Sequence, residues 1–329
     1  MAGLKGKRVL VTGASSGVGL ATVERLAREG ATLALIARGA EALEQAAGRA
    51  RAHGAVAHAL PVDVTDRDAV TAAVLRADAL LGGIDVVVSN AGAVAFGHFL
   101  EVEPEDFDRT VEITFTGAVN VIRTALPILR ERQGMIVVVS SMMARLPLPA
   151  FSAYTASKHA LRGFLNTLSV EEREQRTGVR FAMVSPGPLD TPVYGRATSA
   201  GGRQPAKLFD AYEADEIAKA VVRAIGRPRH DHVVGGESKL MTALYTVARP
   251  LGELPLVLVD RWYRLGGEPA TPPGALWSAN DRARVGDGHP GRRSGDVVAL
   301  ARNLGAAAGR AAQLGTKLLR TVPELPRER

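Results

Sequence analysis

The sequence predicts an α/β protein with a doubly wound parallel sheet, followed by a helical C-terminal extension. Apolar, strand-like runs alternate with helical patterns over the first two-thirds of the 329-residue chain. A glycine-rich turn comes directly after the first apolar run, and polar or glycine residues directly follow several later runs. Such alternation is typical of parallel strands joined by right-handed helical crossovers, with helices on both faces of the sheet. The residues after the strands should then meet at one edge of the sheet, where such folds bind ligands.

Most of the predicted strands are continuously apolar, as expected of strands covered on both faces. We expect strands at residues 8–12, 32–37, 55–62, 85–89, 135–140 and 179–184, with a shorter one at 231–234. We expect helices at residues 17–29, 41–53, 66–81, 104–132, 152–177 and 213–225. Residues 188–211, rich in Gly, Pro and Thr, are predicted to form a long loop. The pattern assigns residues 1–250 to one main domain and residues 251–329 to the extension.

The turn after the first strand has the composition of a dinucleotide-binding turn. Residues 12–19 read TGASSGVG, between a legible strand and a legible helix. Glycine can take backbone angles closed to other residues, lets the chain pass close to a phosphate, and lets helix and strand pack tightly. The free N–H groups and the dipole at the start of the helix favour a diphosphate. We therefore predict a Rossmann-type dinucleotide site at this turn, and the alternative is an ordinary connecting turn. Its residues are Gly13, Ser15, Ser16, Gly17, Val18 and Gly19.

Arg38 indicates which dinucleotide is bound. It directly follows the second predicted strand, where NAD-binding proteins usually place an acidic residue that accepts hydrogen bonds from the ribose hydroxyls. A guanidinium fork suits a 2′-phosphate instead. We interpret Arg38 as a ligand of NADP(H), and the alternative is an exposed loop arginine.

A carboxylate after the third strand could contact the adenine. Asp63 and its neighbour Val64 stand at this position, and the carboxylate could accept a hydrogen bond from the adenine amino group. The alternative is that Thr65 or Asp66 caps the next helix while Asp63 belongs to the turn. Both interpretations can hold together.

Ser141, Tyr154 and Lys158 are the strongest candidates for chemistry. Tyr154 and Lys158 are four residues apart on a predicted helix, so their side chains share a face. A lysine beside a phenol stabilises the phenolate and lowers the tyrosine pKa. Such a tyrosine can donate a proton to a carbonyl oxygen while hydride attacks the carbon, or accept one in reverse. A serine hydroxyl can stabilise the charge that develops on the same oxygen.

With these residues the chain resembles the short-chain dehydrogenase/reductase family over residues 5–250. The resemblance rests on residues 12–19, on Ser141, Tyr154 and Lys158, and on the segments Asn90-Ala91-Gly92 and Pro186-Gly187-Pro188-Leu189-Asp190-Thr191. It implies that Ser141 orients the carbonyl, that Tyr154 is the acid/base and that Lys158 also holds the nicotinamide ribose. It further implies cofactor contacts from Asn90, Ala91 and Gly92, and from Pro186, Gly187 and Thr191 along the nicotinamide half. Family members commonly form dimers or tetramers through two long helices, here residues 104–132 and 152–177.

Thr114 departs from the family pattern. Many members have an asparagine at this place in the long helix before the serine strand, where it binds a water of the proton relay. One interpretation is that the threonine hydroxyl or the local backbone holds the same water. The other is a weakened relay with slow or absent turnover. We favour the first, because the other three catalytic roles are intact.

Composition and charge argue against several other classes of protein. Cysteine is absent, which removes disulfides and thiolate metal sites. His98 and His159, the histidines nearest the expected site, have no metal-ligand spacing with another histidine or a carboxylate pair, so no metal is predicted. No basic helix with base-reading spacing and no aromatic platform is visible, so no nucleic-acid partner is expected. No apolar stretch reaches the ~18 residues of a membrane span. The first seven residues lack an apolar signal core, and we expect a cytoplasmic protein.

Most of the net charge of +7 lies towards the C-terminus, because residues 226–329 contain 16 basic and 10 acidic residues, a net of +6. Residues 296–322 are predicted to form a helix with one apolar stripe and basic neighbours. Such a helix could lie on an anionic membrane surface, dock on the main domain or pair subunits. We favour docking, because alanine and glycine weaken the apolar stripe.

The residues expected around the site predict a small hydrophobic carbonyl or alcohol substrate. The candidate wall, several of whose members could instead pack the core, is Met142, Met143, Ala144, Leu146, Leu148, Phe151, Leu189, Val193 and Tyr194, with Phe96 and Phe99. Two functions follow. The first is an NADP(H)-dependent oxidoreductase that interconverts a hydrophobic ketone or aldehyde and its alcohol. The second is a non-catalytic NADP(H)-binding sensor or scaffold; the intact Ser141, Tyr154 and Lys158 favour the first.

Overall fold

The structure is a computed structural model of the chain. It describes residues 4–286 apart from positions 191, 203, 206–210, 229–230, 250–251, 254–255, 258–259, 261–268, 270–273 and 280. The helix expected over residues 296–322 lies outside the described residues.

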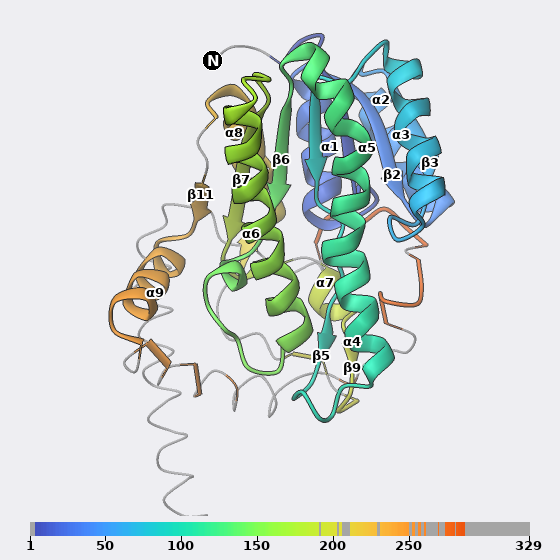
Figure 1. The fold of residues 1–329 in the computed structure, drawn as a ribbon. Coiled ribbons are helices and arrows are strands. Elements are labelled where there is room, and N and C mark those ends of the chain that lie inside the picture. The colour runs from blue at the N-terminus through green and yellow to red at the C-terminus, as the bar shows by residue number, and fades with distance from the viewer. Residues whose placement is uncertain are drawn as a thin grey trace, which may run out of the picture.

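A seven-stranded parallel sheet forms the centre of the molecule (Figure 1). Its strand order is β3-β2-β1-β4-β6-β7-β11. The strands are β1 (Arg8–Thr12), β2 (Thr32–Ala37), β3 (Ala57–Pro61), β4 (Val86–Ser89), β6 (Met135–Val139), β7 (Arg180–Pro186) and β11 (Asp231–Val234). The direction of the winding reverses between β1 and β4. In open parallel sheets, ligands bind beyond the carboxyl ends of the strands at such a reversal.

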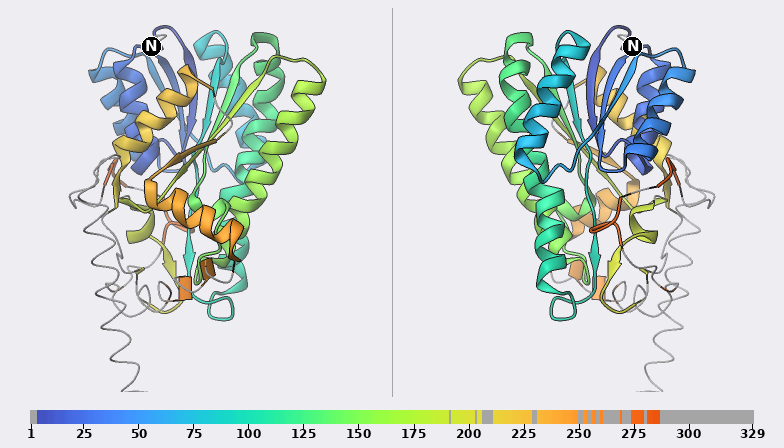
Figure 2. Two further views of the ribbon diagram at one scale, coloured as in Figure 1. Left: turned by 90° about the vertical axis from the view of Figure 1, so that its left-hand side faces the viewer. Right: turned by 90° about the vertical axis from the view of Figure 1, so that its right-hand side faces the viewer.

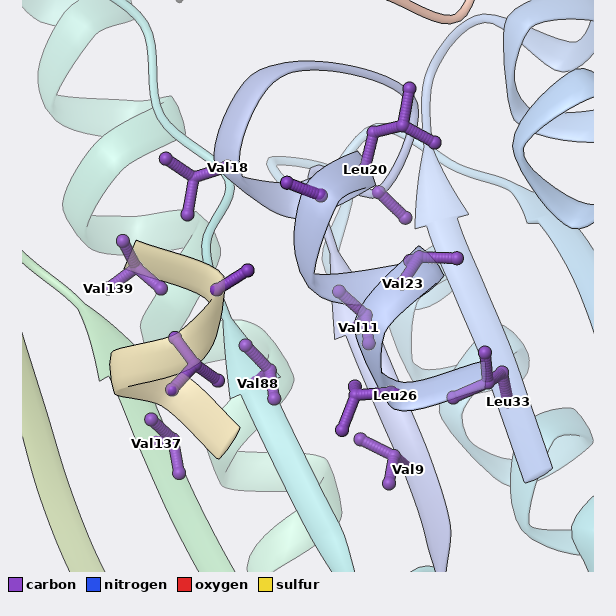
Figure 3. Close-up of a cluster of buried hydrophobic side chains, with 14 of the residues drawn as sticks. Val9, Val11, Val18, Leu20, Val23, Leu26, Leu33, Val88, Val137 and Val139 are labelled. Atoms are coloured by element: carbon purple, nitrogen blue, oxygen red, sulfur yellow. The ribbon is translucent and has the colours of Figure 1, made fainter. Parts of the chain in front are cut away.

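Helices cover both faces of the sheet, as the two side views show (Figure 2). On one face lie α1 (Gly17–Arg28), α2 (Ala40–Ala52) and α8 (Ala214–Gly226), and on the other α3 (Arg67–Leu81), α5 (Gly117–Arg132) and α6 (Ser152–Glu174). Neighbouring residues of one strand, such as Val9 and Leu10, are fully buried in different core clusters. Figure 3 shows the first cluster, in which Val9 and Val11 of β1 lie near Leu26 of α1. The continuously apolar strands are therefore explained by burial on both faces.

The predicted fold class is confirmed, and most of the expected elements lie within three residues of their predicted bounds. The long helix expected over residues 104–132 is divided into α4 (Pro104–Val111), a π-helix at Glu112–Thr116, and α5. The helix expected to reach residue 177 ends at Glu174, shortly before Arg176 takes a φ of 54°.

Several elements were not predicted from the sequence. They are β5 (Ala95–Phe96), the short elements β8 (Leu189–Asp190), α7 (Pro192–Gly195), β9 (Thr198–Ser199) and β10 (Tyr212–Glu213), and the helix α9 (Gly236–Val247). β9 pairs with β5 and β10 pairs with β8, so the expected long loop is pinned to the main body at two places. Within the described part of the chain, every helix is too short or too polar to cross a bilayer.

Part of the extension folds back onto the main body. We call residues 274–279 and 281–286 the covering segment; it is drawn in orange-red beyond the carboxyl ends of the strands (Figure 1). Leu276 of this segment is fully buried in the core cluster of α3, α5 and α6, and Ala283 is 6% exposed in the cluster of α1, α2 and α8. The covering segment thus contributes apolar side chains to both sides of the sheet.

Candidate active site

A cavity of about 190 Å³ opens at the carboxyl edge of the sheet. It brings together many of the predicted cofactor residues, namely Gly13, Ser15, Ser16, Gly17, Val18, Arg38, Asp63, Val64, Asn90, Ala91, Gly92, Tyr154 and Lys158. Five of the described residues predicted for the site stand outside its lining, namely Gly19, Thr114, Ser141, Pro186 and Gly187. Thr191 lies outside the described residues. The edge of the sheet therefore gathers residues that are far apart in the sequence, as the topology requires.

The glycine-rich turn has no room for side chains at two positions. Gly13 has a φ of +63°, and a Cβ there would lie 2.9 Å from the Ala91 Cα. A Cβ on Gly19 would collide with the Gly13 carbonyl oxygen and lie 2.6 Å from Asn90 Nδ2. The backbone is thus brought close to α1, whose first residue is Gly17. This cradle of backbone amides at a helix N-terminus fits the diphosphate of a dinucleotide.

Asn90 ties the ends of β4 and β1 together. Its Nδ2 donates to the carbonyl oxygens of Thr12 and Gly13, both at 3.2 Å, and its backbone N–H donates to Thr12 Oγ1 at 3.0 Å. The asparagine therefore fixes the two loops that flank the reversal in strand order. On the far side, the Gly187 N–H donates to the Val234 carbonyl, so Pro186 and Gly187 hold β7 to β11.

Three arginines surround the end of the cavity where an adenosine would bind. Arg38 and Arg196 line the cavity, and Arg109 donates to the Asp63 carboxylate at 2.5 Å. Burial lowers the pKa of Arg38, and the nearby charges of Arg109 and Arg196 lower it further, whereas Asp63 opposes them. Arg109 and Arg196 were missed from the sequence, because each lies far along the chain from the glycine-rich turn and belongs to no local motif.

Asp63 is fixed by its own turn. Its Oδ1 accepts from the Thr65 N–H at 3.0 Å and from the Thr65 hydroxyl at 2.9 Å. Burial opposes ionisation, but the hydrogen bonds from Thr65 and the charge of Arg109 hold the pKa of Asp63 below its usual range. Asp66 caps α3 through the Ala69 N–H at 3.0 Å, so the capping interpretation is correct for Asp66. Asp63 remains at the cavity as an ionised group.

Tyr154 and Lys158 lie on one face of α6, as their spacing predicts. Lys158 Nζ lies 5.3 Å from the centroid of the Tyr154 ring and donates to the Val139 carbonyl at 3.0 Å. Burial alone lowers the pKa of Lys158 to about 8. At pH 7 the lysine therefore still carries its proton, and a buried positive charge beside a phenol favours the phenolate.

Ser141 stands at the end of β6 and caps a short 3₁₀-helix, Met142–Ala144. Its Oγ accepts from the Met143 N–H at 3.1 Å, and the residue is 8% exposed. The 3₁₀-helix packs against α6, the helix that carries Tyr154. The serine hydroxyl hydrogen is not used by this bond, because the oxygen is the acceptor.

Thr114 lies in the π-helix and holds the loop after β4. Its Oγ1 is within 3.3 Å of both the Ala93 N–H and the Ala93 carbonyl oxygen, and the side chain is fully buried. π-helical turns inside α-helices are frequent at functional sites. Thr114 therefore fixes the backbone next to Gly92 rather than lining the cavity itself.

Replacing Thr114 with Val should lower the free energy of unfolding by about 1–3 kcal/mol, because the isosteric side chain leaves the buried Ala93 N–H without its acceptor. Thr114→Ser keeps the hydroxyl and should recover most of this loss. Urea denaturation of the three proteins measures the difference. A Thr114→Val protein as stable as the wild type would show that the bond to Ala93 contributes nothing.

The apolar residues expected around the substrate divide into two groups. Phe96, Met143 and Phe151 are buried in a small third core, as the packing alternative supposed, and Ala144 and Leu146 are also buried. Phe99 is 63% exposed and stacks edge-on against Phe107. Partly buried Met142, Leu148 and Val193 pack around the third core together with Tyr154, and Leu189 and Val193 line the cavity. The side chain of Tyr194 lies outside the described residues.

Comparison with known proteins finds similar chains among oxidoreductases. A family model described as short chain dehydrogenase matches residues 7–202. The chain is 34% identical over 234 residues to glycine betaine reductase ATRR of Emericella nidulans, covering 69% of this chain and 18% of that protein. It is 35% identical over 237 residues to the uncharacterized oxidoreductase Mb1570 of Mycobacterium bovis, covering 69% and 66% of the two chains. It thus spans less than two thirds of the length of either relative.

A solved structure supports the same comparison. The alcohol dehydrogenase of the archaeon Thermococcus sibiricus, complexed with 5-hydroxy-NADP, is 28% identical and aligns with a TM-score of 0.62. The match covers 69% of this chain and 94% of the archaeal one. The similarity therefore extends over nearly the whole of that enzyme.

Proposed function

Because the chain belongs to the short-chain dehydrogenase family, we propose that it is an NADP(H)-dependent oxidoreductase that interconverts a hydrophobic ketone or aldehyde and its alcohol. The observation that carries the proposal is Lys158, which is fully buried at the cavity and whose Nζ lies 5.3 Å from the Tyr154 ring. A buried lysine is costly, and the cost is understandable where its charge activates a neighbouring phenol.

Each residue would have one task. When bound, NADP(H) supplies or accepts the hydride. The Tyr154 hydroxyl donates a proton to the carbonyl oxygen during reduction and takes one from the alcohol during oxidation. Lys158 stabilises the phenolate that is left, and the Ser141 hydroxyl donates to the oxygen on which charge develops. The glycine-rich turn, Asn90 and the N-terminus of α1 would hold the cofactor.

A preference for the phosphorylated cofactor is supported by the charges at the adenosine end. Arg109 and Arg196 are close enough to Arg38 to lower its pKa, and Arg109 donates to Asp63. A cluster of guanidinium groups favours a phosphate over a ribose hydroxyl. The substrate class is supported by apolar Leu189 and Val193, which line the cavity together with Tyr154.

Replacing Arg38 with Asp should change the cofactor preference from NADPH towards NADH by about 10- to 100-fold in the ratio of dissociation constants. Aspartate repels the 2′-phosphate and accepts hydrogen bonds from ribose hydroxyls. Fluorescence titration with both cofactors gives the ratio, in which any general loosening of the site cancels. An unchanged ratio would exclude Arg38 as the phosphate ligand.

The experiment that tests the proposed function is consumption of NADPH in the presence of hydrophobic aldehydes and ketones. Turnover supports the oxidoreductase. Binding of NADPH without turnover across a broad panel would favour the sensor or scaffold alternative.

Assembly into a homodimer or homotetramer through α4–α5 and α6 is part of the proposal, and the mass of the particle in solution tests it.

A further inference from the structure

The covering segment reaches the N-terminus of α1. The Gly17 N–H donates to the Arg284 carbonyl oxygen at 2.8 Å, and Ser16 and Arg284 form a parallel bridge. Gly17 opens α1 and has no partner within that helix for its N–H, as the first residues of helices have none. Amides of this kind bind the diphosphate of a dinucleotide. A carbonyl oxygen of the extension therefore accepts the hydrogen bond of the Gly17 N–H, which would otherwise be available to the cofactor.

The same segment also accepts hydrogen bonds from the guanidinium group of Arg38. Arg38 Nη1 donates to the Leu276 carbonyl at 2.8 Å, and Nη2 donates to the carbonyls of Ala275 and, at 3.1 Å, Ser278. Arg196 likewise donates to the Ala279 carbonyl at 3.0 Å and to the Ser278 hydroxyl at 2.7 Å. Carbonyl oxygens carry partial negative charge and accept the hydrogen bonds that a phosphate would accept.

The size of the cavity points the same way. With the covering segment in place, its volume is about 190 Å³. Sites for drug-sized ligands are usually about 300–1,000 Å³, and a dinucleotide is at least that large. Ala275, Ser278 and Ala279 form one wall of the cavity, so movement of the segment would enlarge it.

The segment is also anchored outside the cavity. Gln45 Oε1 accepts from the Ala283 N–H at 3.0 Å, and Arg49 Nη2 donates to the Ala283 carbonyl at 2.8 Å. At the other end Trp277 Nε1 donates to Asp106 at 2.5 Å. Neither Gln45 nor Arg49 lines the cavity, so these contacts hold the segment without touching the space for a cofactor.

From these contacts we propose that the covering segment is an internal competitor of the dinucleotide. Its carbonyl oxygens satisfy Gly17 and Arg38, and the cofactor phosphates must displace them to bind. The apparent association constant for the cofactor is then the intrinsic constant multiplied by the fraction of molecules in which the segment is displaced. The inference rests on the proposed function, because it assigns the displaced groups to the diphosphate and the 2′-phosphate.

The first test is hydrogen–deuterium exchange of residues 281–286 in the full chain, with and without saturating NADP⁺. Displacement predicts that the Ala283 amide exchanges faster when NADP⁺ is bound, because it loses the Gln45 acceptor. Trypsin cleavage after Arg282 and Arg284 should also become faster. Slower or unchanged exchange and cleavage, with NADP⁺ bound, would overturn the competitor and make the segment a fixed wall of the site.

The second test weakens the outer anchors. In the double variant Gln45→Ala/Arg49→Ala the dissociation constant for NADPH should fall on the order of 10-fold, since two hydrogen bonds that hold the closed form are removed. Arg51→Ala is the matched control, because Arg51 lies on the same helix but donates to Ala57 and Glu44. If the loss of positive charge were the only effect, NADPH would bind more weakly to the double variant and to Arg51→Ala, whereas the proposal predicts tighter binding to the double variant.

The outcomes separate the two proposals. An unchanged or higher dissociation constant in the double variant, with binding intact in both proteins, overturns the competitor and leaves the oxidoreductase standing. No binding of NADP(H) or NAD(H) by the wild type or by the folded double variant contradicts the proposed function, and the competitor with it.

Discussion

Replacing Tyr154 with Phe is expected to lower kcat/KM for reduction of a hydrophobic carbonyl by about 10²–10⁴-fold. The change removes only the hydroxyl, which is the proton donor in the proposed reaction. The ring keeps its place among partly buried Met142, Leu148 and Val193, so packing should be retained. The dissociation constant for NADPH should therefore stay within about two-fold, since a loss confined to the chemical step leaves binding unchanged.

The control for this variant is Tyr245→Phe, on α9. Tyr245 stacks with Arg249 and does not line the cavity. The Tyr245→Phe variant should leave both turnover and NADPH binding unchanged. If Tyr154→Phe retained more than about a tenth of the activity, the proton would have to come from another donor. A parallel loss of NADPH affinity would instead point to a structural effect.

The sheet and the glycine-rich turn could be predicted because their signals are local. A strand buried on both faces has a continuous apolar run, such as residues 9–11 of β1 and 86–88 of β4, and that run can be recognised without knowing its neighbours. Gly13 and Gly19 are required by close contacts of the turn with its own backbone and with the loop after β4. The rule that ligands bind at the carboxyl edge then predicts that Arg38, Asp63 and Asn90, each directly after a strand, lie near the glycine-rich turn.

What could not be predicted depends on contacts between distant segments. Arg109 reaches Asp63 across 46 positions of sequence, and Arg38 reaches Ser278 across 240. Arg38 looked like a free phosphate ligand from the sequence, because the carbonyls that bind it lie in an irregular Gly/Pro/Arg-rich stretch. The π-helix at Thr114 has no pattern that distinguishes it from the α-helices on either side. Its Thr114 contacts Ala93, which lies 21 residues away in the sequence.

Lys158 lowers the stability of the fold because it is buried, and it raises the rate of the proposed reaction because it activates Tyr154. Replacing it with Met should change stability and turnover in opposite directions. The lysine pKa falls from 10.5 to about 8 on burial. A shift of this size costs about 3 kcal/mol of folding free energy when the lysine is charged, whereas removing the lysine takes the donor from the buried Val139 carbonyl, which costs about 1–3 kcal/mol. Lys158→Met should therefore raise the free energy of unfolding at pH 7 by up to about 2 kcal/mol. Turnover should fall by at least about 10²-fold, because Tyr154 loses the neighbouring charge.

The sign of the pH dependence distinguishes this explanation from better packing by methionine. Below pH 8 the lysine is protonated in both the folded and the unfolded chain, and the full cost of burying the charge is present. Between pH 8 and about 10.4 the folded chain releases its proton first, so the wild type gains stability as the pH rises. The advantage of Lys158→Met should accordingly shrink between pH 7 and pH 10 in urea denaturation. Lys239→Met, at an exposed position, should show no such trend. An advantage that stayed constant with pH would assign the effect to packing and remove the buried charge from the explanation of how Tyr154 is activated.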